Sequence, residues 1–312
     1  MILQQFFLVM SFLKNRRRKK AKKKAQATAM QLESMVKRTQ LTQLALDQVA
    51  AGVGNQAEHE IIVSLTTFDK RIEDVYIAIE SLMQQSLKAD RVVLCISKEE
   101  FKEADIPAAL RKQQARGLEI LFCEKDLGPY KKYFYTLQKY PKSLLITADD
   151  DFIYPPYFID QLYRAYLQNP KVIHCHRSHK IRFNKRGHIA PYKQWQWDHF
   201  DTTPSLQIFP TGVGGVLYFP GCLDTDAINP DAFLKICPHA DDVWLKAMSL
   251  KKGIRCAQVK DHRPWSTRFL LIEGTQQFSL KRENKKSQLG NDHKIKSTFD
   301  HYDLWPLLGG CK

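Results

Sequence analysis

The chain has 312 residues, 44% of them hydrophobic, and carries a formal net charge of +15. That length can bury the core of one large domain or two small ones. Its seven cysteines are an odd number without a Cys-x-x-Cys pair, which argues against a disulfide framework or a zinc site and favours reduced thiols in a reducing compartment.

The first residues combine an apolar run with a dense basic run. Residues 2–13 are apolar but too short to span a bilayer, and nine Lys and Arg residues lie between Lys14 and Lys24. Because the charges follow the apolar run, the segment does not have the order of a secretory signal peptide. The pattern is typical of an interfacial anchor, which predicts peripheral attachment to an anionic membrane surface on the cytoplasmic face.

Two alternatives for this segment are a disordered basic tail and a nucleic-acid-binding arm. The basic run has no aromatic side chains to stack on bases, so we expect no nucleic-acid partner. Residues 26–50 have the pattern of an amphipathic helix, and 51–55 have the composition of a linker. We therefore treat residues 1–57 as a basic, amphipathic extension.

Strand and helix patterns alternate after this extension. They predict an α/β domain over residues 58–312, with a mostly parallel sheet and helices on both faces. The expected strands are 61–66, 91–96, 118–123, 144–147, 172–176 and 254–260. The expected helices are 75–83, 101–116 with a break at Pro107, 129–140, 157–167 and 229–250. We expect loops and antiparallel strands over 177–197, in a region that shapes a pocket, and a mobile loop over 279–296.

Three adjacent carboxylates, Asp149, Asp150 and Asp151, end the fourth expected strand. Such side chains repel one another and have no use in a core, but a divalent cation offsets that cost. Strand alternation would place Asp149 and Asp151 on one side and Asp150 on the other. Hard oxygen ligands suit Mg²⁺ or Mn²⁺, and the ligand crevice of an open α/β sheet lies at this end of the strands. The alternative is a solvated loop that caps the next helix.

Basic side chains follow two other expected strands. The first strand ends at Thr66, and Arg71 then lies at a strand–helix turn, where it can meet nucleotide phosphates. Asp126 follows the third strand and can accept hydrogen bonds from a base or ribose, with Lys131 or Lys132 directed at the same crevice. A solvated turn and a simple helix cap are the alternatives. The chain has neither a Gly-x-Gly-x-x-Gly nor a Gly-Lys-Ser/Thr motif.

The second half of the chain holds further candidates. The glycine-rich run 212–215 allows the backbone to approach a ligand, or forms a buried bulge. Asp241 and Asp242 open a helical pattern, where they can supply a catalytic base or merely helix N-terminal charges. His262 and His293 are candidates for a further metal ligand, although a single histidine is more often a surface or packed residue.

The span from about residue 60 to 300 resembles GT-A-fold glycosyltransferases, especially small bacterial nucleotide-sugar transferases that build surface polysaccharides or lipopolysaccharide. The residues that carry the resemblance are 64–72, 126–132, Asp149–Asp151, 212–215 and 240–244. The resemblance implies that the Asp-x-Asp carboxylates hold Mn²⁺ or Mg²⁺ on the donor diphosphate, and that the later acidic pair activates the acceptor. The Gln-x-x-Arg-Trp motif of processive synthases is absent from the sequence, which implies transfer of a single sugar.

The sequence therefore predicts a metal-dependent, inverting glycosyltransferase with a nucleotide-sugar donor and a glycan or lipid-linked acceptor. The expected donor-binding residues are Thr66, Arg71, Asp126, Lys132, Asp149 and Asp150. The expected metal ligands are Asp149, Asp151 and His262, and the expected acceptor-binding residues are Gly214, Gly215 and Trp244. Asp242 is the expected base and Asp241 its reserve. A sugar-nucleotide nucleotidyltransferase and a non-catalytic membrane- or nucleic-acid-binding protein are the alternatives, although the turn after the first strand lacks the glycines of the former.

Overall fold

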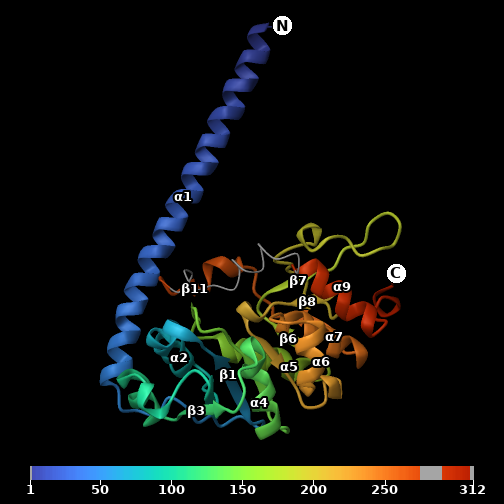
Figure 1. The fold of residues 1–312 in the computed structure, drawn as a ribbon. Helices are drawn as coiled ribbons and strands as arrows, with labels where there is room; N and C mark the ends of the chain where they lie inside the picture. Colours follow the sequence, from blue (N-terminus) through green and yellow to red (C-terminus); the bar gives the residue numbers. More distant parts are fainter. Residues whose placement is uncertain (1, 275–289, 310–312) are drawn as a thin grey trace.

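The computed structural model describes residues 2–274 and 290–309, and for residues 2–13, 15 and 23 it describes the backbone alone (Figure 1). Within these residues a seven-stranded sheet has the order β10-β6-β9-β4-β1-β2-β3. All its described strands are parallel except β9, which pairs antiparallel with β4 and with β6. Its strands are β1 (Ile61–Thr66), β2 (Arg91–Ser97), β3 (Leu118–Cys123), β4 (Leu144–Thr147), β6 (Ile173–Cys175), β9 (Val216–Tyr218) and β10 (Cys256–Gln258).

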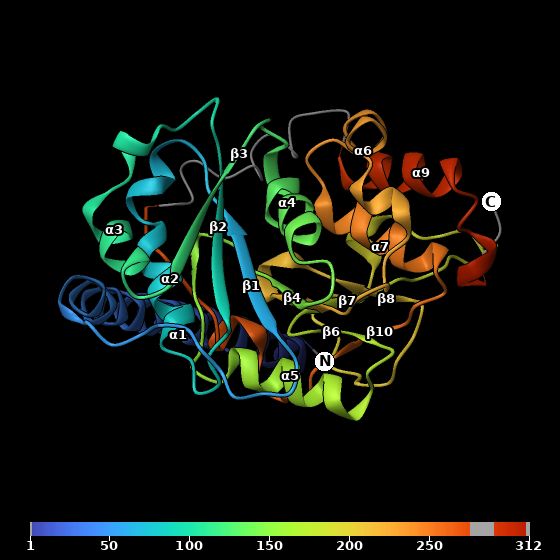
Figure 2. The ribbon, with the colours of Figure 1, turned by 90° about the horizontal axis from the view of Figure 1, so that it is seen from below.

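Helices cover both faces of this sheet (Figure 2). Successive strand residues point to opposite faces, so Leu144 and Ile146 of β4 join one core cluster while Leu145 joins the other. The first cluster packs against α1 (Ile2–Asp47), α2 (Val75–Met83), α3 (Ala108–Gln114) and α5 (Phe158–Gln168). The second packs against α4 (Lys131–Lys139), α6 (Pro230–Ile236), α7 (Asp241–Lys251) and α9 (Asn291–His301). The expected fold class, a mostly parallel α/β sheet between helices with an N-terminal helix, is confirmed.

Short elements complete the structure. Two antiparallel pairs lie outside the main sheet, β5 (Phe152–Ile153) with β11 (Leu270–Leu271) and β7 (Ser178–Lys180) with β8 (Ile208–Pro210). The 3₁₀ turns are η1 (Asp69–Glu73), η2 (Glu103–Asp105), η3 (Gly128–Tyr130), η4 (Tyr192–Gln194), η5 (Gly212–Gly214), η6 (Thr225–Ile228), η7 (Trp265–Thr267) and η9 (Pro306–Leu308). The antiparallel strand β7 confirms the expectation for 177–197.

Three expectations need correction. Residues 229–250 form two helices, because the chain breaks between α6 and α7, where His239 has a φ of 57°. Residues 279–289 of the expected mobile loop lie outside the described residues. The rest of that segment, from Asn291 onward, belongs to the helix α9. The expected linker is tied to the domain, since Gly52 donates to Arg116 O and Gly54 donates to Ala89 O.

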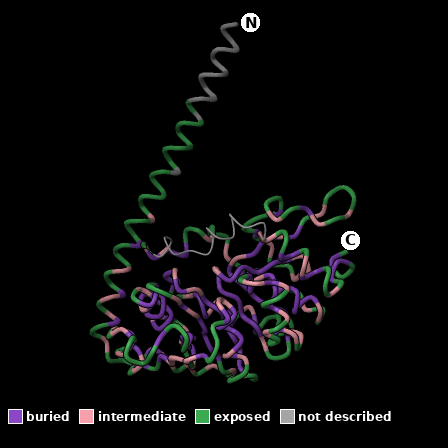
Figure 3. Tube along the Cα trace, in the orientation of Figure 1, coloured by how far each residue is buried: buried purple, intermediate pink, exposed green. Residues whose placement is uncertain are grey.

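α1 has an exposed first part and a docked last part (Figure 3). Its described side chains from residue 14 to 29 are exposed, whereas Leu41 and Ala45 are buried against the domain. Arg38 forms an ion pair of 2.6 Å with Asp74, just after η1, and Ser34 donates to Leu271 O at 2.6 Å. Among the helices of the described chain, none has the length and apolar content needed to cross a bilayer.

A buried ion pair joins α2 to the end of α3. Arg116 donates to both carboxylate oxygens of Glu80, at 2.8 and 3.0 Å, and its Nε donates to Ala50 O at 2.9 Å. Both side chains are almost fully buried. The connection after α1 is therefore fixed to two helices through one guanidinium. The six cysteines of the described chain are also buried and unpaired, as expected for reduced thiols.

Candidate active site

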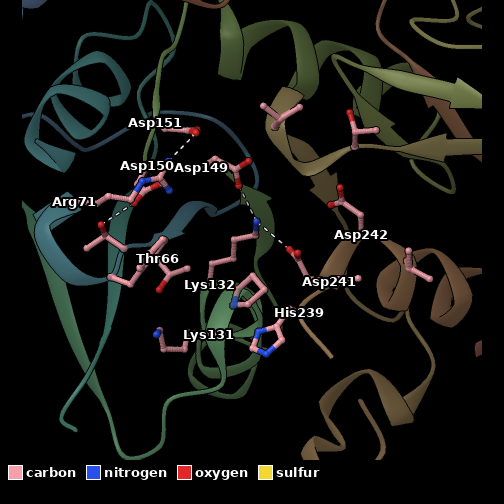
Figure 4. Close-up of a pocket in the computed structure, with 18 of the residues that line it drawn as sticks. Thr66, Arg71, Lys131, Lys132, Asp149, Asp150, Asp151, His239, Asp241 and Asp242 are labelled. Atoms are coloured by element: carbon pink, nitrogen blue, oxygen red, sulfur yellow. Dashed lines mark hydrogen bonds and ion pairs between the residues drawn. The ribbon is translucent and has the colours of Figure 1, made fainter. Parts of the chain in front are cut away.

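A cavity of about 490 Å³ lies beyond the carboxyl ends of β1 and β4 (Figure 4). Parallel strands bring the segments that follow them to one edge of the sheet, so residues distant in sequence meet here. One wall comes from residues 66–71 and 126–132, the floor from 149–151, and the opposite wall from 209–213 and 239–243. Arg177, Tyr192 and Asn291 complete that second wall.

Arg71 binds two of the three adjacent carboxylates. Its Nη1 lies 2.7 Å from Asp150 Oδ1 and its Nη2 lies 2.8 Å from Asp151 Oδ2. Asp150 is the most buried of the three, and its other oxygen accepts a hydrogen bond of 2.7 Å from the Thr67 hydroxyl. Burial raises the pKa of Asp150 to about 7, against the attraction of Arg71. The expected strand alternation of the triplet is wrong, because β4 ends at Thr147 and Asp150 and Asp151 lie in the turn that follows it.

Lys132 connects the third carboxylate to the opposite wall. Its Nζ lies 2.8 Å from Asp149 Oδ1 and 2.9 Å from Asp241 Oδ2. Burial alone would lower the pKa of Lys132, but the attraction of Asp149, Asp241 and Asp242 outweighs it and raises that pKa well above its usual value. Lys132 therefore remains charged and holds the two walls of the cavity together.

Asp242 is held by the backbone of η5. Its Oδ1 accepts a hydrogen bond of 2.8 Å from the Gly212 amide. A Cβ atom at residue 212 would lie only 2.7 Å from that oxygen, so the close approach requires glycine. Burial and the neighbouring Asp241 raise the pKa of Asp242 to about 8, although Lys132 and the Gly212 amide oppose the shift. A carboxyl group with such a pKa is mostly protonated at pH 7 and becomes available as a base as the pH rises toward 8.

The wall near β3 combines an ion pair with a histidine that the sequence interpretation did not select. Asp126 pairs with Lys131 and accepts a hydrogen bond of 2.9 Å from the Gly128 amide. His239 lines the cavity beside Gly128, with its Nδ1 3.3 Å from the position of a Cβ at that glycine. Its place immediately before Ala240-Asp241-Asp242 was the available sequence signal.

Several expected residues do not line this cavity. His262 is exposed and lies outside its lining, so it is not brought to the carboxylates, and His293 is exposed on α9. Gly214 packs against Arg177 and Gly215 against Phe158. Trp244 has no exposed surface and packs in the core against Phe233 and Tyr302, because α7 turns this position away from Asp242. The three positions expected to bind the acceptor therefore lie outside the lining of this cavity.

Other lining residues come from segments without a clear sequence pattern. Arg177 and Tyr192 belong to the irregular region that was expected to shape a pocket, and Asn291 begins α9. Thr67 and Phe68 follow the expected Thr66. The sequence thus indicated the region of the second wall but not the side chains that form it.

The residues present fit a divalent cation only in part. Asp149 and Asp151 offer hard oxygen atoms at the cavity, with 28% and 13% of their side chains exposed. In residues 2–274 and 290–309, no three His, Cys, Asp or Glu side chains are grouped to hold a metal ion. Mg²⁺ commonly uses one or two carboxylates together with substrate phosphates. A cation at these two aspartates would therefore need the phosphates of a bound nucleotide.

The fold and the cavity define an α/β protein with a charged crevice at the carboxyl edge of its sheet. No protein-family model matches the chain, and no curated protein does so. Solved structures with a similar fold include a mannosyltransferase from Pyrobaculum calidifontis in complex with GDP-Man and Mn²⁺, with 12% identity, a TM-score of 0.44 and coverage of 91% of this chain and 84% of that one.

Two further structures are similar at the same level. S. aureus TarS 1–349 in complex with UDP has 10% identity and a TM-score of 0.45, over 78% of this chain and 70% of that one. The inositol-1-phosphate CTP transferase from T. maritima has 9% identity and a TM-score of 0.43, over 78% and 98%. Identities and TM-scores this low assign no activity, so the functional argument rests on the site.

Proposed function

We propose that the protein is a glycosyltransferase that moves a single sugar from a nucleotide-sugar donor to a glycan or lipid-linked acceptor. The observation that supports this proposal is one cavity with two chemically different walls. Arg71, Lys132 and the carboxylates Asp149–Asp151 suit a diphosphate and its cation, while Asp241 and Asp242 lie across from them.

The donor would bind along the first wall. Arg71 and Lys132 would supply positive charge for the diphosphate, and Asp150 would orient Arg71. Asp126 and Thr66, which also line the cavity, would contact the base and the ribose. We propose Asp149 and Asp151 as the ligands of Mn²⁺ or Mg²⁺. Such a cation, when bound, neutralises charge on the departing diphosphate.

The acceptor hydroxyl would lose its proton to Asp242. Asp241 is tied to the Lys132 ammonium, whereas Asp242 is held through one oxygen by a backbone amide, so Asp242 is better placed to accept a proton. A base on the side opposite the donor suits inversion through an oxocarbenium-like transition state. Asp241 remains the reserve for this role.

We further propose a bacterial surface-polysaccharide pathway and a peripheral position on the inner face of the cell membrane. The support for the membrane position is the exposed basic segment of α1, which projects away from the domain (Figure 1). Basic residues near an anionic leaflet each contribute about 1 kcal/mol of attraction. A surface position would bring a lipid-linked acceptor within reach.

The decisive experiment measures hydrolysis of UDP-, GDP- and CDP-sugars with and without Mn²⁺. We expect metal-dependent release of nucleoside diphosphate from at least one donor. Asp151→Ala should abolish this turnover while the folded state persists, because Arg71 keeps its ion pair with Asp150 in the variant. A nucleotidyltransferase would instead release pyrophosphate from a nucleoside triphosphate and a sugar phosphate. Full activity of Asp151→Ala would refute the metal assignment.

A further inference from the structure

The irregular region between β7 and β8 carries a half-exposed aromatic side chain close to the cavity. Trp197 is 49% exposed, although it takes part in ordered contacts. Its ring stacks on His179, with 4.8 Å between ring centres and 19° between planes. Its Nε1 donates a hydrogen bond of 3.1 Å to Tyr192 O. Such contacts hold the ring in place while about half of it stays open to solvent.

His179 is a suitable support for this ring because it is neutral. Its Nδ1 accepts a hydrogen bond of 3.2 Å from the Asp198 amide, which requires an unprotonated nitrogen. Burial, together with the charge of Arg177, lowers the pKa of His179 to about 4. His179 can therefore keep this hydrogen bond across the neutral range.

Tyr192 connects Trp197 to the cavity. Its ring centre lies 5.5 Å from that of Trp197, and Tyr192 itself lines the cavity. Asp242 is near enough to contribute, after burial, to a rise in the pKa of the Tyr192 hydroxyl to about 12. The Tyr192 amide donates a hydrogen bond of 2.6 Å to Asp292, which fixes this part of the wall to α9.

Polar groups lie beside the aromatic pair. Arg177 Nε lies 2.7 Å from Asp198 Oδ1, and Arg177 lines the cavity while 47% of the Asp198 side chain is exposed. A fixed aromatic face next to a carboxylate and a guanidinium matches a sugar ring, which has an apolar face of C–H groups and hydroxyls at its edge. An apolar surface with a few placed polar groups is the usual composition of a small-ligand site.

We propose that Trp197, Tyr192 and the Arg177–Asp198 pair form a subsite for the acceptor sugar. The ring of the acceptor stacks on Trp197, its hydroxyls meet Asp198 and Arg177, and its reacting hydroxyl passes Tyr192 toward Asp242. This inference rests on the proposed function and specifies that the acceptor presents a pyranose ring. It replaces the acceptor positions expected at Gly214, Gly215 and Trp244.

Saturation-transfer NMR with methyl glycosides of glucose, galactose, mannose and N-acetylglucosamine tests the subsite without any donor. We expect at least one glycoside to bind, and Trp197→Ala to weaken that binding about tenfold, equivalent to ~1.4 kcal/mol. Trp197→Phe should restore most of it. Phe200→Ala is the matched control, since Phe200 is 47% exposed in the same segment and has no ring contact among the described residues.

The subsite proposal is overturned if no glycoside binds, or if Trp197→Ala binds as the original protein does or weakens no more than Phe200→Ala. Hydrolysis of nucleotide sugars is measured separately. Loss of binding in Trp197→Ala with normal donor hydrolysis would support both proposals. Glycoside binding that depends on Trp197, in a protein that hydrolyses no donor, would support the subsite and reject the transferase.

Discussion

At the scale of single residues, Asp242 and Asp241 differ in what holds them. Asp242→Asn keeps the shape and the acceptor oxygen for the Gly212 amide, but removes the basic carboxylate. We expect transfer to fall by roughly 10²–10⁴-fold while donor binding changes little. Calorimetric titration with the donor and a transfer assay separate these effects. If Asp241→Asn loses only transfer and Asp242→Asn loses donor binding, the two roles are exchanged.

The pH dependence of sugar transfer tests the charges around Asp242. A base must be unprotonated to act, so a pKa raised to about 8 predicts that the rate increases with pH up to that region. Asp241→Asn removes the repulsion between Asp241 and Asp242 and should move the rise of the rate to lower pH. Lys132→Met removes the attraction between Lys132 and Asp242 and should move the rise of the rate to higher pH. The measurement is log(kcat/KM) against pH, and shifts in the same direction for both variants would contradict the assignment.

The site residues show what a sequence can reveal about chemistry. Asp149–Asp151 and Asp241–Asp242 could be selected from their positions relative to strand and helix patterns. The ion-pair partners of these carboxylates could not be predicted, because Arg71 and Asp150, for example, are 79 positions apart in the chain. The burial of Trp244 was equally hidden, since it depends on which way α7 rotates against the sheet.

At the scale of elements, the buried pair Arg116–Glu80 joins α2, α3 and the connection after α1. Arg116→Met leaves the buried Glu80 carboxylate without the guanidinium that compensates its charge, which should lower the free energy of unfolding by about 3–5 kcal/mol. Urea denaturation measures this loss. The variant Arg116→Met/Glu80→Met should recover part of it, because no uncompensated charge remains.

A surface pair is the control for that measurement. Arg164 pairs with Asp160 within α5, with 75% of the Arg164 side chain exposed, so Arg164→Met should leave the denaturation midpoint nearly unchanged. If Arg116→Met is as stable as Arg164→Met, the buried pair does not stabilise the junction of the three segments.

The elements of the first half were more predictable than those of the second. Strands β1 to β4 and helices α2 to α5 follow the alternation of buried strands with amphipathic helices, which imposes a regular apolar period. The second half has strands of two or three residues, too short to show a period. The helix α9 has a polar composition, and only its contacts through Ile295 and Phe299 place it in the core.

At the scale of the whole molecule, the basic part of α1 predicts salt-dependent membrane attachment. Changing the three arginines of residues 16–18 to Gln should weaken binding to anionic vesicles by roughly 100-fold, from about 1 kcal/mol per residue. Sedimentation with phosphatidylserine vesicles at low salt measures this. The matched control changes three exposed cations of the domain, Lys235, Lys252 and Arg255.

Deletion of residues 1–24 should remove vesicle binding and leave donor hydrolysis intact, since the docked part of α1 remains. Equal sedimentation of the full-length protein with neutral and anionic vesicles would reject the electrostatic anchor. Loss of hydrolysis after the deletion would show that the exposed part of α1 contributes to the active site.

The Arg38–Asp74 pair is one of the contacts through which α1 meets the segment that carries Arg71. Asp74 follows η1, whose Arg71 is held by two buried ion pairs. The Arg38 and Asp74 side chains are 37% and 29% exposed, and a pair of this kind is worth only about 0–1 kcal/mol. Breaking this pair should therefore cost far less free energy than breaking either ion pair of Arg71. A change at the contact between α1 and Asp74 can thus leave Arg71 and the donor wall in place.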